Sequence, residues 1–359
     1  MASAISSTSR AMLTNGHIIN DIFKIEEKLG CGTYGDCYKS QNVHTKEKMA
    51  LKFIKNEPKY RKQAEMEIRI LHTLKIADPE VISGFVVYKY NFWYESHVVL
   101  VFELLGKNLF ELIKDNKYEG FSNHDTKKAC KQILNCLVLL DKLDIIHADL
   151  KPENIVKDPR TNTFKVIDFG SSFFQEKRCR YPIQSSYYRA PEVIIGMSAT
   201  TSIDMWSLGC ILFELDTGLP LFNSNNERDI IMTQMSIVGS PTKDMLSASH
   251  KHIKKYYYIN DIFKFKYDTH GREHPVKGVL LKDKCVSKDP VFIEFIMMCL
   301  NIDPTKRMTP QQAFCHPWVK DDTENDIKGA PIELDCIDEP MDDGGSKRAK
   351  RIKLDDIKP

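Results

Sequence analysis

Polar side chains that bind metal ions or accept protons lie close together near the middle of the chain. Asp149 precedes Asn154 by five residues, and a short apolar strand predicted over Phe164–Ile167 leads directly into Asp168. Phosphoryl transfer needs such a set, because the protein must hold magnesium ions against the phosphates while a free carboxylate orients the attacking hydroxyl. Lys151 would face the transferring group. These residues therefore predict phosphoryl-transfer chemistry.

The same residues belong to three short motifs, which occur in the order HADLKPEN, IDFG and APE. Together they match the protein-kinase signature set, whereas DFG or APE alone would mean little. The chain resembles a eukaryotic protein kinase of the CMGC group, and within it the dual-specificity Tyr-regulated (DYRK) and homeodomain-interacting kinases. HADLKPEN and three further segments carry this resemblance: IDFGSS at Ile167–Ser172, IQSSYYRAPE at Ile183–Glu192 and FELLGKNLFELIK at Phe102–Lys114.

The resemblance covers about residues 23–318 and implies an α+β, two-lobed protein kinase fold. A chain of 359 residues accommodates this fold and leaves only tails. The expected parts are a disordered tail over residues 1–20, a kinase domain over 21–318 and a disordered acidic then basic tail over 319–359. Within the domain we expect a small β-rich N-lobe over about 21–105, a larger helical C-lobe over about 106–318, and a CMGC-type insert over about 240–289.

A glycine-rich hairpin is predicted from Asp21 onward. Gly30, Gly32 and Gly35 form GxGxxG, in which backbone N–H groups can approach phosphate oxygens without an intervening Cβ. Alone the motif is weak, and it would equally suit a dinucleotide fold if a βαβ unit followed. The next segment is instead a strand, MALKFIK, which favours the kinase interpretation. By resemblance, its Lys52 reaches the α and β phosphates.

The carboxylate partner of this lysine should lie on a helix predicted over Tyr60–Leu74. Glu65 and Glu67 both compete for the ion pair, and the match of QAEMEIRIL to the relatives' pattern selects Glu67. Cys37 stands where the family usually has Val and can still cover the adenine ring. For Cys37 we prefer plain packing to chemical reactivity.

The resemblance also implies the remaining nucleotide contacts. Phe102 would flank the adenine pocket, and the backbone of Glu103 to Leu105 would pair with the adenine edge. The other expected cofactor-binding positions are Leu29, Ala50, Val156 and Ile167. The implied cofactors are ATP and Mg²⁺, with Asn154 and Asp168 as metal ligands.

The resemblance also implies one catalytic and two structural roles. Asp149 would be the base or orienter of the substrate hydroxyl. Asp204 would hold the backbone around His147, and Arg307 would form a buried ion pair with Glu192.

Composition excludes several classes of protein. The content of 42% hydrophobic and 28% charged residues is that of a soluble globular protein, and the net charge of +2 excludes a globally basic nucleic-acid binder. The chain contains ten cysteines but no CxxC pair, which predicts reduced thiols in a cytosolic or nuclear protein. No apolar run is long enough for a membrane span, so we expect no membrane partner. The first residues only weakly resemble a transit peptide and are not a secretory signal, and Ala2 excludes myristoylation.

Charge blocks distinguish the C-terminal tail. Asp321–Asp343 is acidic, and a compact basic cluster follows, consisting of Lys347, Arg348, Lys350, Arg351 and Lys353. Such a cluster predicts binding to a nuclear import receptor. An inert solvated tail is the alternative, and contact with nucleic acid is a weaker third one. We expect the protein in the nucleus and the cytoplasm.

The predicted function is a protein kinase that phosphorylates Ser or Thr of protein substrates. By resemblance, Arg189 turns toward the activation segment and leaves a backbone carbonyl facing the P+1 position, which suits a proline there because proline has no N–H. One alternative is a catalytically weak or inactive pseudokinase scaffold in the nucleus, which would be marked by loss of Lys52, Asp149 or Asp168. Another is a non-kinase nucleotide binder, against which the lack of GxxxxGK[ST] argues.

Regulation should differ from that of most kinases. They carry Arg before the catalytic Asp, where it binds a phosphorylated activation loop, but this chain has Ala148. In DYRK relatives the second Tyr of a YxY pair is phosphorylated by the enzyme itself. That position is Pro182 here, and the nearest hydroxyl belongs to Tyr181. We expect activity without an upstream kinase and self-phosphorylation, if any, at Tyr181; the alternative is that Tyr181 only packs against the large lobe.

Overall fold

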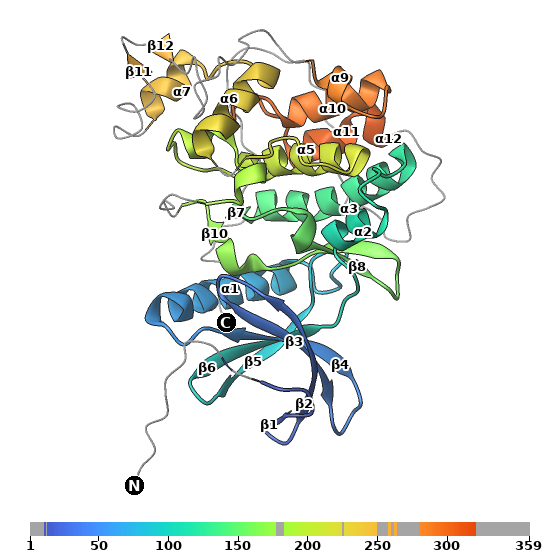
Figure 1. Cartoon of the computed structure of the whole chain (residues 1–359). Helices are drawn as coiled ribbons and strands as arrows, with labels where there is room; N and C mark the ends of the chain where they lie inside the picture. Colours follow the sequence, from blue (N-terminus) through green and yellow to red (C-terminus); the bar gives the residue numbers. More distant parts are fainter. Residues whose placement is uncertain are drawn as a thin grey trace. The chain divides into compact units, whose positions relative to one another are not determined.

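The computed structural model describes residues 11, 13–176, 183–224, 226–249, 258–259, 262–263 and 280–320. Two compact units make up the chain (Figure 1): residues 1–112 with 152–173, and residues 113–151 with 174–359. The first holds a six-stranded sheet, whereas the second is mainly helical. This confirms the predicted α+β kinase fold. The predicted N-lobe ended near residue 105, but residues 152–173 also belong to the first unit. One contact that joins them to it is the hydrogen bond from Val166 N–H to the Gly84 carbonyl, at 2.9 Å.

The sheet of the first unit follows from alternating burial along its strands. Phe23 and Ile25 are buried while Lys24 between them is exposed, as a strand with one face on the core requires. The strand order is β1-β2-β3-β4-β6-β5. Their bounds are β1 Ile18–Ile19, β2 Phe23–Cys31, β3 Gly35–Asn42, β4 Lys48–Ile54, β5 Tyr88–Tyr94 and β6 His97–Glu103.

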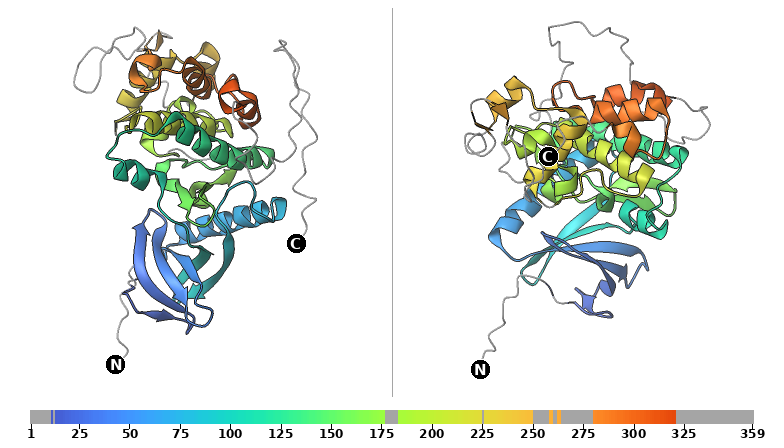
Figure 2. Two further views of the ribbon diagram at one scale, coloured as in Figure 1. Left: turned by 90° about the vertical axis from the view of Figure 1, so that its right-hand side faces the viewer. Right: turned by 45° about the horizontal axis from the view of Figure 1, so that its top comes forward.

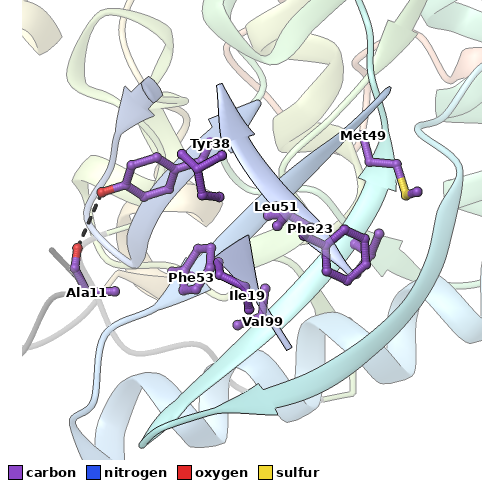
Figure 3. Packing of buried hydrophobic residues seen from close by; sticks show 10 residues of the cluster. Ala11, Ile19, Phe23, Tyr38, Met49, Leu51, Phe53 and Val99 are labelled. Carbon is purple, nitrogen blue, oxygen red and sulfur yellow. Dashed lines mark hydrogen bonds between the residues drawn. The ribbon is translucent and has the colours of Figure 1, made fainter. Parts of the chain in front are cut away.

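A hydrophobic cluster covers one face of this sheet (Figure 3). It comprises Ala11, Ile19, Phe23, Ile25, Tyr38, Met49, Leu51, Phe53, Val99 and Val101. Ile19 is fully buried in this cluster, and its strand β1 pairs with β2. The expectation of disorder throughout residues 1–20 is therefore wrong for Ala11 and residues 13–20, because these residues supply core side chains and sheet hydrogen bonds.

One long helix and a hairpin complete the first unit. Helix α1, Pro58–Ala77, extends the predicted helix at both ends and begins with a proline in its first turn, where no intrahelical N–H donor is needed. Strands β8, Ile155–Asp158, and β9, Thr163–Val166, form the hairpin between Asn154 and Asp168. Short 3₁₀ turns, η1 at Pro152–Asn154 and η2 at Phe169–Ser171, flank this hairpin.

The second unit is built around α5, Ser202–Thr217, whose residues from Ile203 to Asp216 are all buried. A helix that is buried on all sides lies in the centre of a core, and α3 and α10 both pack against it (Figure 2). The long partner helices are α3 Asn123–Lys142, α6 Glu227–Val238 and α10 Pro290–Cys299. The shorter helices are α2 Leu109–Asp115, α4 Pro191–Ile194, α7 Lys243–Ala248, α9 Leu281–Lys284, α11 Pro310–Cys315 and α12 Pro317–Lys320.

Short strands and one further turn complete the described elements. They are β7 Ile145–Ile146, β10 Phe173–Phe174, β11 Tyr258–Ile259, β12 Ile262–Phe263 and η3 Ser186–Tyr188. Among the described residues, no helix is both long and apolar enough to cross a membrane. Most of the predicted insert, Tyr181 and Pro182, and the tail from residue 321 lie outside the described residues.

Candidate active site

Lys52 lies between two carboxylates in the first unit. Its Nζ donates to Glu67 Oε1 at 2.6 Å and to Asp168 Oδ1 at 2.7 Å. Lys52 comes from β4, Glu67 from α1 and Asp168 from the end of the β8–β9 hairpin, so three separate elements must fold together to form the cluster. Burial opposes the charge on Lys52, but the two carboxylates outweigh it and raise the lysine pKa.

The structure also distinguishes the two candidate glutamates. The Glu67 side chain is 2% exposed and faces Lys52, whereas Glu65 is exposed to solvent. Burial raises the pKa of Glu67 even though Lys52 lowers it. A buried carboxylate of this kind depends on its cation, because an unpaired buried charge is costly. The selection of Glu67 is confirmed.

The predicted metal ligands Asn154 and Asp168 lie at the two ends of the β8–β9 hairpin. Ile167 N–H donates to the backbone carbonyl of Asn154 at 2.9 Å, which places Asp168 beside Asn154. Asp168 has a left-handed backbone, with φ of 62°, and its carboxylate accepts from Gly170 N–H. A carboxylate and an amide oxygen fit Mg²⁺, which usually takes one or two protein ligands and completes its shell with phosphate oxygens and water. No group of three or more His, Cys, Asp and Glu side chains suited to a metal occurs in the described ranges.

Glycine is needed at the three positions of the glycine-rich loop for different physical reasons. A Cβ at Gly35 would lie 1.9 Å from the Phe53 carbonyl oxygen on β4, so close strand packing alone requires glycine there. A Cβ at Gly30 would meet no described atom within 4 Å, and one at Gly32 would meet only the Gly35 carbonyl at 3.6 Å. The explanation of phosphate approach therefore fits Gly30 and Gly32, while Gly35 is explained by packing.

The predicted nucleotide contacts all lie in the first unit. Cross-strand pairing places Cys37 opposite Lys52, and Ala50 opposite Phe102. Leu29 lies on β2, Leu105 follows β6, Val156 lies on β8, and Ile167 precedes Asp168. Their contacts with a nucleotide remain predictions. Burial raises the pKa of the Cys37 thiol to about 11, which supports packing over reactivity for this residue.

The Glu103 side chain has a structural role that the sequence did not indicate. One oxygen accepts from Val87 N–H at 2.9 Å and from Lys165 Nζ at 2.7 Å, and the other contacts Arg160. Glu103 is buried, so these donors satisfy its charge. The Glu103 N–H also donates to the Val87 carbonyl at 3.1 Å, so only the Glu103 carbonyl remains a candidate for pairing with adenine.

The second unit carries the predicted base. Asp149 Oδ2 accepts from Lys151 Nζ at 2.8 Å, and Asp149 Oδ1 accepts from the hydroxyl of Ser185 at 2.7 Å. Lys151 also donates to Ser185 Oγ at 3.0 Å, which closes a triangle of three side chains. Sequence reasoning missed Ser185, although it lies within the quoted segment IQSSYYRAPE.

Gln184 joins the segment before APE to the catalytic loop. Its backbone N–H donates to the Ala148 carbonyl at 3.0 Å. Its side-chain nitrogen donates to Ser207 Oγ at 2.9 Å and to the Ile203 carbonyl at 3.1 Å, and its side-chain oxygen accepts from Ala190 N–H at 2.9 Å. These neutral contacts hold the segment before APE against the Ala148 backbone and helix α5.

Both predicted supporting pairs are confirmed in the second unit. Asp204 accepts the backbone N–H groups of His147 and Ala148 at 2.7 and 3.0 Å. Burial raises the Asp204 pKa to about 6 despite these hydrogen bonds. Arg307 binds Glu192 through two hydrogen bonds of 2.6 and 2.9 Å, and both residues are buried.

Comparison with known proteins adds a family match. The family model described as "Protein kinase domain" matches residues 23–319. A crystal structure of a kinase domain superposes with a TM-score of 0.79 at 31% identity, covering 87% of this chain and 99% of that chain.

Curated relatives share the same region. Dual specificity tyrosine-phosphorylation-regulated kinase 2 of Drosophila melanogaster is 38% identical over 300 residues, which cover 83% of this chain and 41% of that protein. Dual specificity tyrosine-phosphorylation-regulated kinase 3 of Mus musculus is 38% identical over 335 residues, 88% of this chain and 56% of the relative. A DYRK-family kinase of Schizosaccharomyces pombe, pom1, is 39% identical over 309 residues, 83% of this chain and 27% of its own. The chain thus spans between 27% and 56% of these relatives.

Proposed function

Because the chain belongs to the protein kinase family, we propose that it is an enzyme that transfers the γ-phosphoryl group of ATP to Ser or Thr of protein substrates. The observation that carries this proposal is the contact of Lys52 with both Glu67 and Asp168. This cluster joins a phosphate-binding cation to a metal-binding carboxylate, and protein kinases need both groups in place.

Each of the site residues is assigned one role in the proposed reaction. Lys52, held by Glu67, would bind the α and β phosphates, and Asn154 and Asp168 would hold Mg²⁺, which would supply neutralisation of phosphate charge. Asp149 accepts or orients the substrate hydroxyl proton. Lys151 neutralises charge on the transferring group, and Ser185 keeps both Asp149 and Lys151 in position.

A pseudokinase scaffold is the competing function. Its mark would be loss of the cation, the base or the metal ligand, yet Lys52, Asp149 and Asp168 are all present. An assay of the whole chain with radiolabelled ATP, Mg²⁺ and generic basic and proline-directed substrates decides between the two. Incorporation that disappears in Asp149→Asn supports the kinase, whereas no incorporation by the wild-type chain supports the scaffold.

Proline after the phosphoacceptor is the proposed substrate preference. Arg189 Nη2 donates to the Gln184 carbonyl at 2.7 Å, and Arg189 Nε donates to the Ile183 carbonyl at 2.9 Å. Gln184 has a positive φ of 63°, which turns its backbone. These carbonyls accept from Arg189, which differs from the expected carbonyl left facing P+1. A substrate N–H at P+1 would then lack them as acceptors, and proline carries no such N–H. A peptide library without enrichment of Pro at P+1 would contradict this preference.

Activity without an upstream kinase is supported by the contacts of Gln184. They join the segment to the Ala148 carbonyl through neutral hydrogen bonds, so no phosphate is needed at this point. Self-phosphorylation at Tyr181 belongs to the same proposal. Mass spectrometry of protein made in bacteria, beside Tyr181→Phe, tests both parts. An inactive product that becomes active only with an added kinase would contradict the first part, and equal activity without phosphate at Tyr181 would contradict the second.

We assign nuclear import to the basic cluster of the tail, with the protein distributed between nucleus and cytoplasm. The five cations of Lys347–Lys353 occur within seven residues, a density typical of import signals. Removing residues 346–359 from a fluorescent fusion should shift it to the cytoplasm and leave kinase activity in vitro unchanged. An unchanged nuclear signal would contradict the assignment.

A further inference from the structure

The tip of the glycine-rich loop is tied down by its backbone. Gly32 N–H donates to the Gly35 carbonyl at 2.8 Å and forms a tight turn around Thr33 and Tyr34. The Tyr34 carbonyl accepts from Lys55 N–H at 2.9 Å, and the Thr33 carbonyl accepts from Lys55 Nζ at 2.5 Å. The residue that follows β4 therefore fixes the backbone of both tip residues.

A hydrogen bond between side chains ties the same tip to the segment after Asp168. The Tyr34 hydroxyl lies 2.7 Å from Ser171 Oγ, although the two residues are 137 positions apart in the chain. The Tyr34 ring also meets Tyr60 of α1 edge-on, with 6.2 Å between the ring centroids. A phenylalanine at position 34 could keep the ring contact, but only a tyrosine makes the bond to Ser171.

The ring of Tyr34 borders the predicted phosphate and metal positions. A Cβ placed on Gly170 would lie 3.0 Å from Tyr34 Cδ2, 3.0 Å from Asp168 Oδ1 and 3.1 Å from Lys52 Nζ. These three atoms therefore surround one point. Lys52 Nζ lies 5.9 Å from the Tyr34 ring centroid, within the range of a cation–π interaction. Gly170 itself is held by a hydrogen bond from Gln63 to its carbonyl.

We propose that Tyr34 and Ser171 form a hydroxyl latch that holds the glycine-rich loop closed over the phosphates of a bound nucleotide. Tyr34 is then a positioning residue, and lifting the loop to release ADP requires breaking its bond to Ser171. This inference rests on the proposed function, because it assigns the nucleotide to the Lys52–Asp168 cluster. The latch slows nucleotide exchange without taking part in the transfer step.

The test compares the full-length wild-type chain with Tyr34→Phe, Ser171→Ala and the double variant. Tyr90→Phe is the matched control, because Tyr90 is 44% exposed on β5. Two quantities are measured: amide hydrogen exchange of peptides covering residues 29–36, and the release rate of methylanthraniloyl-ADP with Mg²⁺ in stopped flow. Loss of one hydrogen bond should raise each rate by about two- to tenfold.

The pattern across the variants decides the proposal. Equal increases in the two single variants, with no further increase in the double variant, support a shared bond, and Tyr90→Phe should match the wild type. The latch is overturned if neither rate rises, or if the double variant shows the product of the single effects, since the hydroxyls then act independently. Hydrogen exchange needs no nucleotide, so it decides the latch even if the chain proves unable to transfer phosphate.

Discussion

The two units hold their catalytic residues by different means. In the first, Lys52 lies between two carboxylates that come from positions 15 and 116 residues away along the chain. In the second, Asp149 bonds Lys151 two residues on, and the segment opposite is held by the neutral amide of Gln184. One arrangement depends on ion pairs between distant segments, and the other on a local ion pair together with neutral hydrogen bonds.

This difference indicates which kind of change should disrupt each arrangement. Ala148 and Gln184 both have positive φ values, 62° and 63°, a backbone state that costs free energy in residues with a side chain. Surrounding contacts must compensate for that strain, and Asp204 supplies part of them by accepting two backbone N–H groups. The cluster of the first unit has this backbone state at Asp168 but not at Lys52 or Glu67, so it is vulnerable to loss of charge as well as to strain at Asp168.

The largest expected effect is a loss of turnover, and it should follow from a substitution in either unit. Asp149→Asn and Asp168→Asn keep side-chain volume but remove the charge that the mechanism uses, so each should reduce kcat by about 100-fold or more. Steady-state phosphorylation measures this loss, and circular dichroism checks that the fold survives. Wild-type turnover in both variants would show that these carboxylates are not the base and the metal ligand.

A second prediction compares a buried arginine of the second unit with an exposed one of the first. Arg307→Leu leaves Glu192 buried without its cation and should lower the free energy of unfolding by about 3–5 kcal/mol. Arg160→Leu removes a side chain that is 64% exposed, and Glu103 and Asp158 both keep Lys165 as a cation, so the loss should be smaller, about 1–2 kcal/mol. Urea unfolding measures both, and equal losses would refute the distinction.

A third prediction concerns the neutral contacts. Gln184→Ala removes the acceptor of the buried Ala190 N–H and the donor to Ser207 Oγ and the Ile203 carbonyl, at a cost of about 1–3 kcal/mol, and should lower kcat about tenfold while nucleotide affinity stays constant. Gln311→Ala, which removes a single bond to Asp141, is the control and should keep full activity. A fall in nucleotide affinity with unchanged kcat would show that Gln184 affects nucleotide binding and not the transfer step.

Motif spacing predicted the catalytic side chains and the fold, because these residues occur in short segments whose order is specific to the family. Contacts between segments could not be predicted in this way. Ser185 binds Asp149 from 36 residues away, and the need for glycine at position 35 depends on the register of β3 against β4. The two-residue strand at Ile18–Ile19 is too short to show a periodic pattern, so its place in the sheet was missed.

The smallest expected effect separates the units by pH. In the first, hydrogen bonds from Arg160 lower the Asp158 pKa to about 2, against the ordinary value of 3.8, so its contribution to stability is present above pH 3.8 and is lost as pH falls through 2. In the second, burial raises the Asp204 pKa to about 6, so its contribution is present below pH 3.8 and is lost as pH rises through 6. The test is the midpoint of urea unfolding, measured from pH 2 to 7. In the wild type the midpoint should fall toward low pH and should also decline between pH 4 and 6. Asp158→Asn should abolish the fall at low pH, and Asp204→Asn should abolish the decline between pH 4 and 6. An unchanged profile in Asp204→Asn would mean that this carboxyl titrates alike in the folded and unfolded chain, and that its two backbone hydrogen bonds offset its burial.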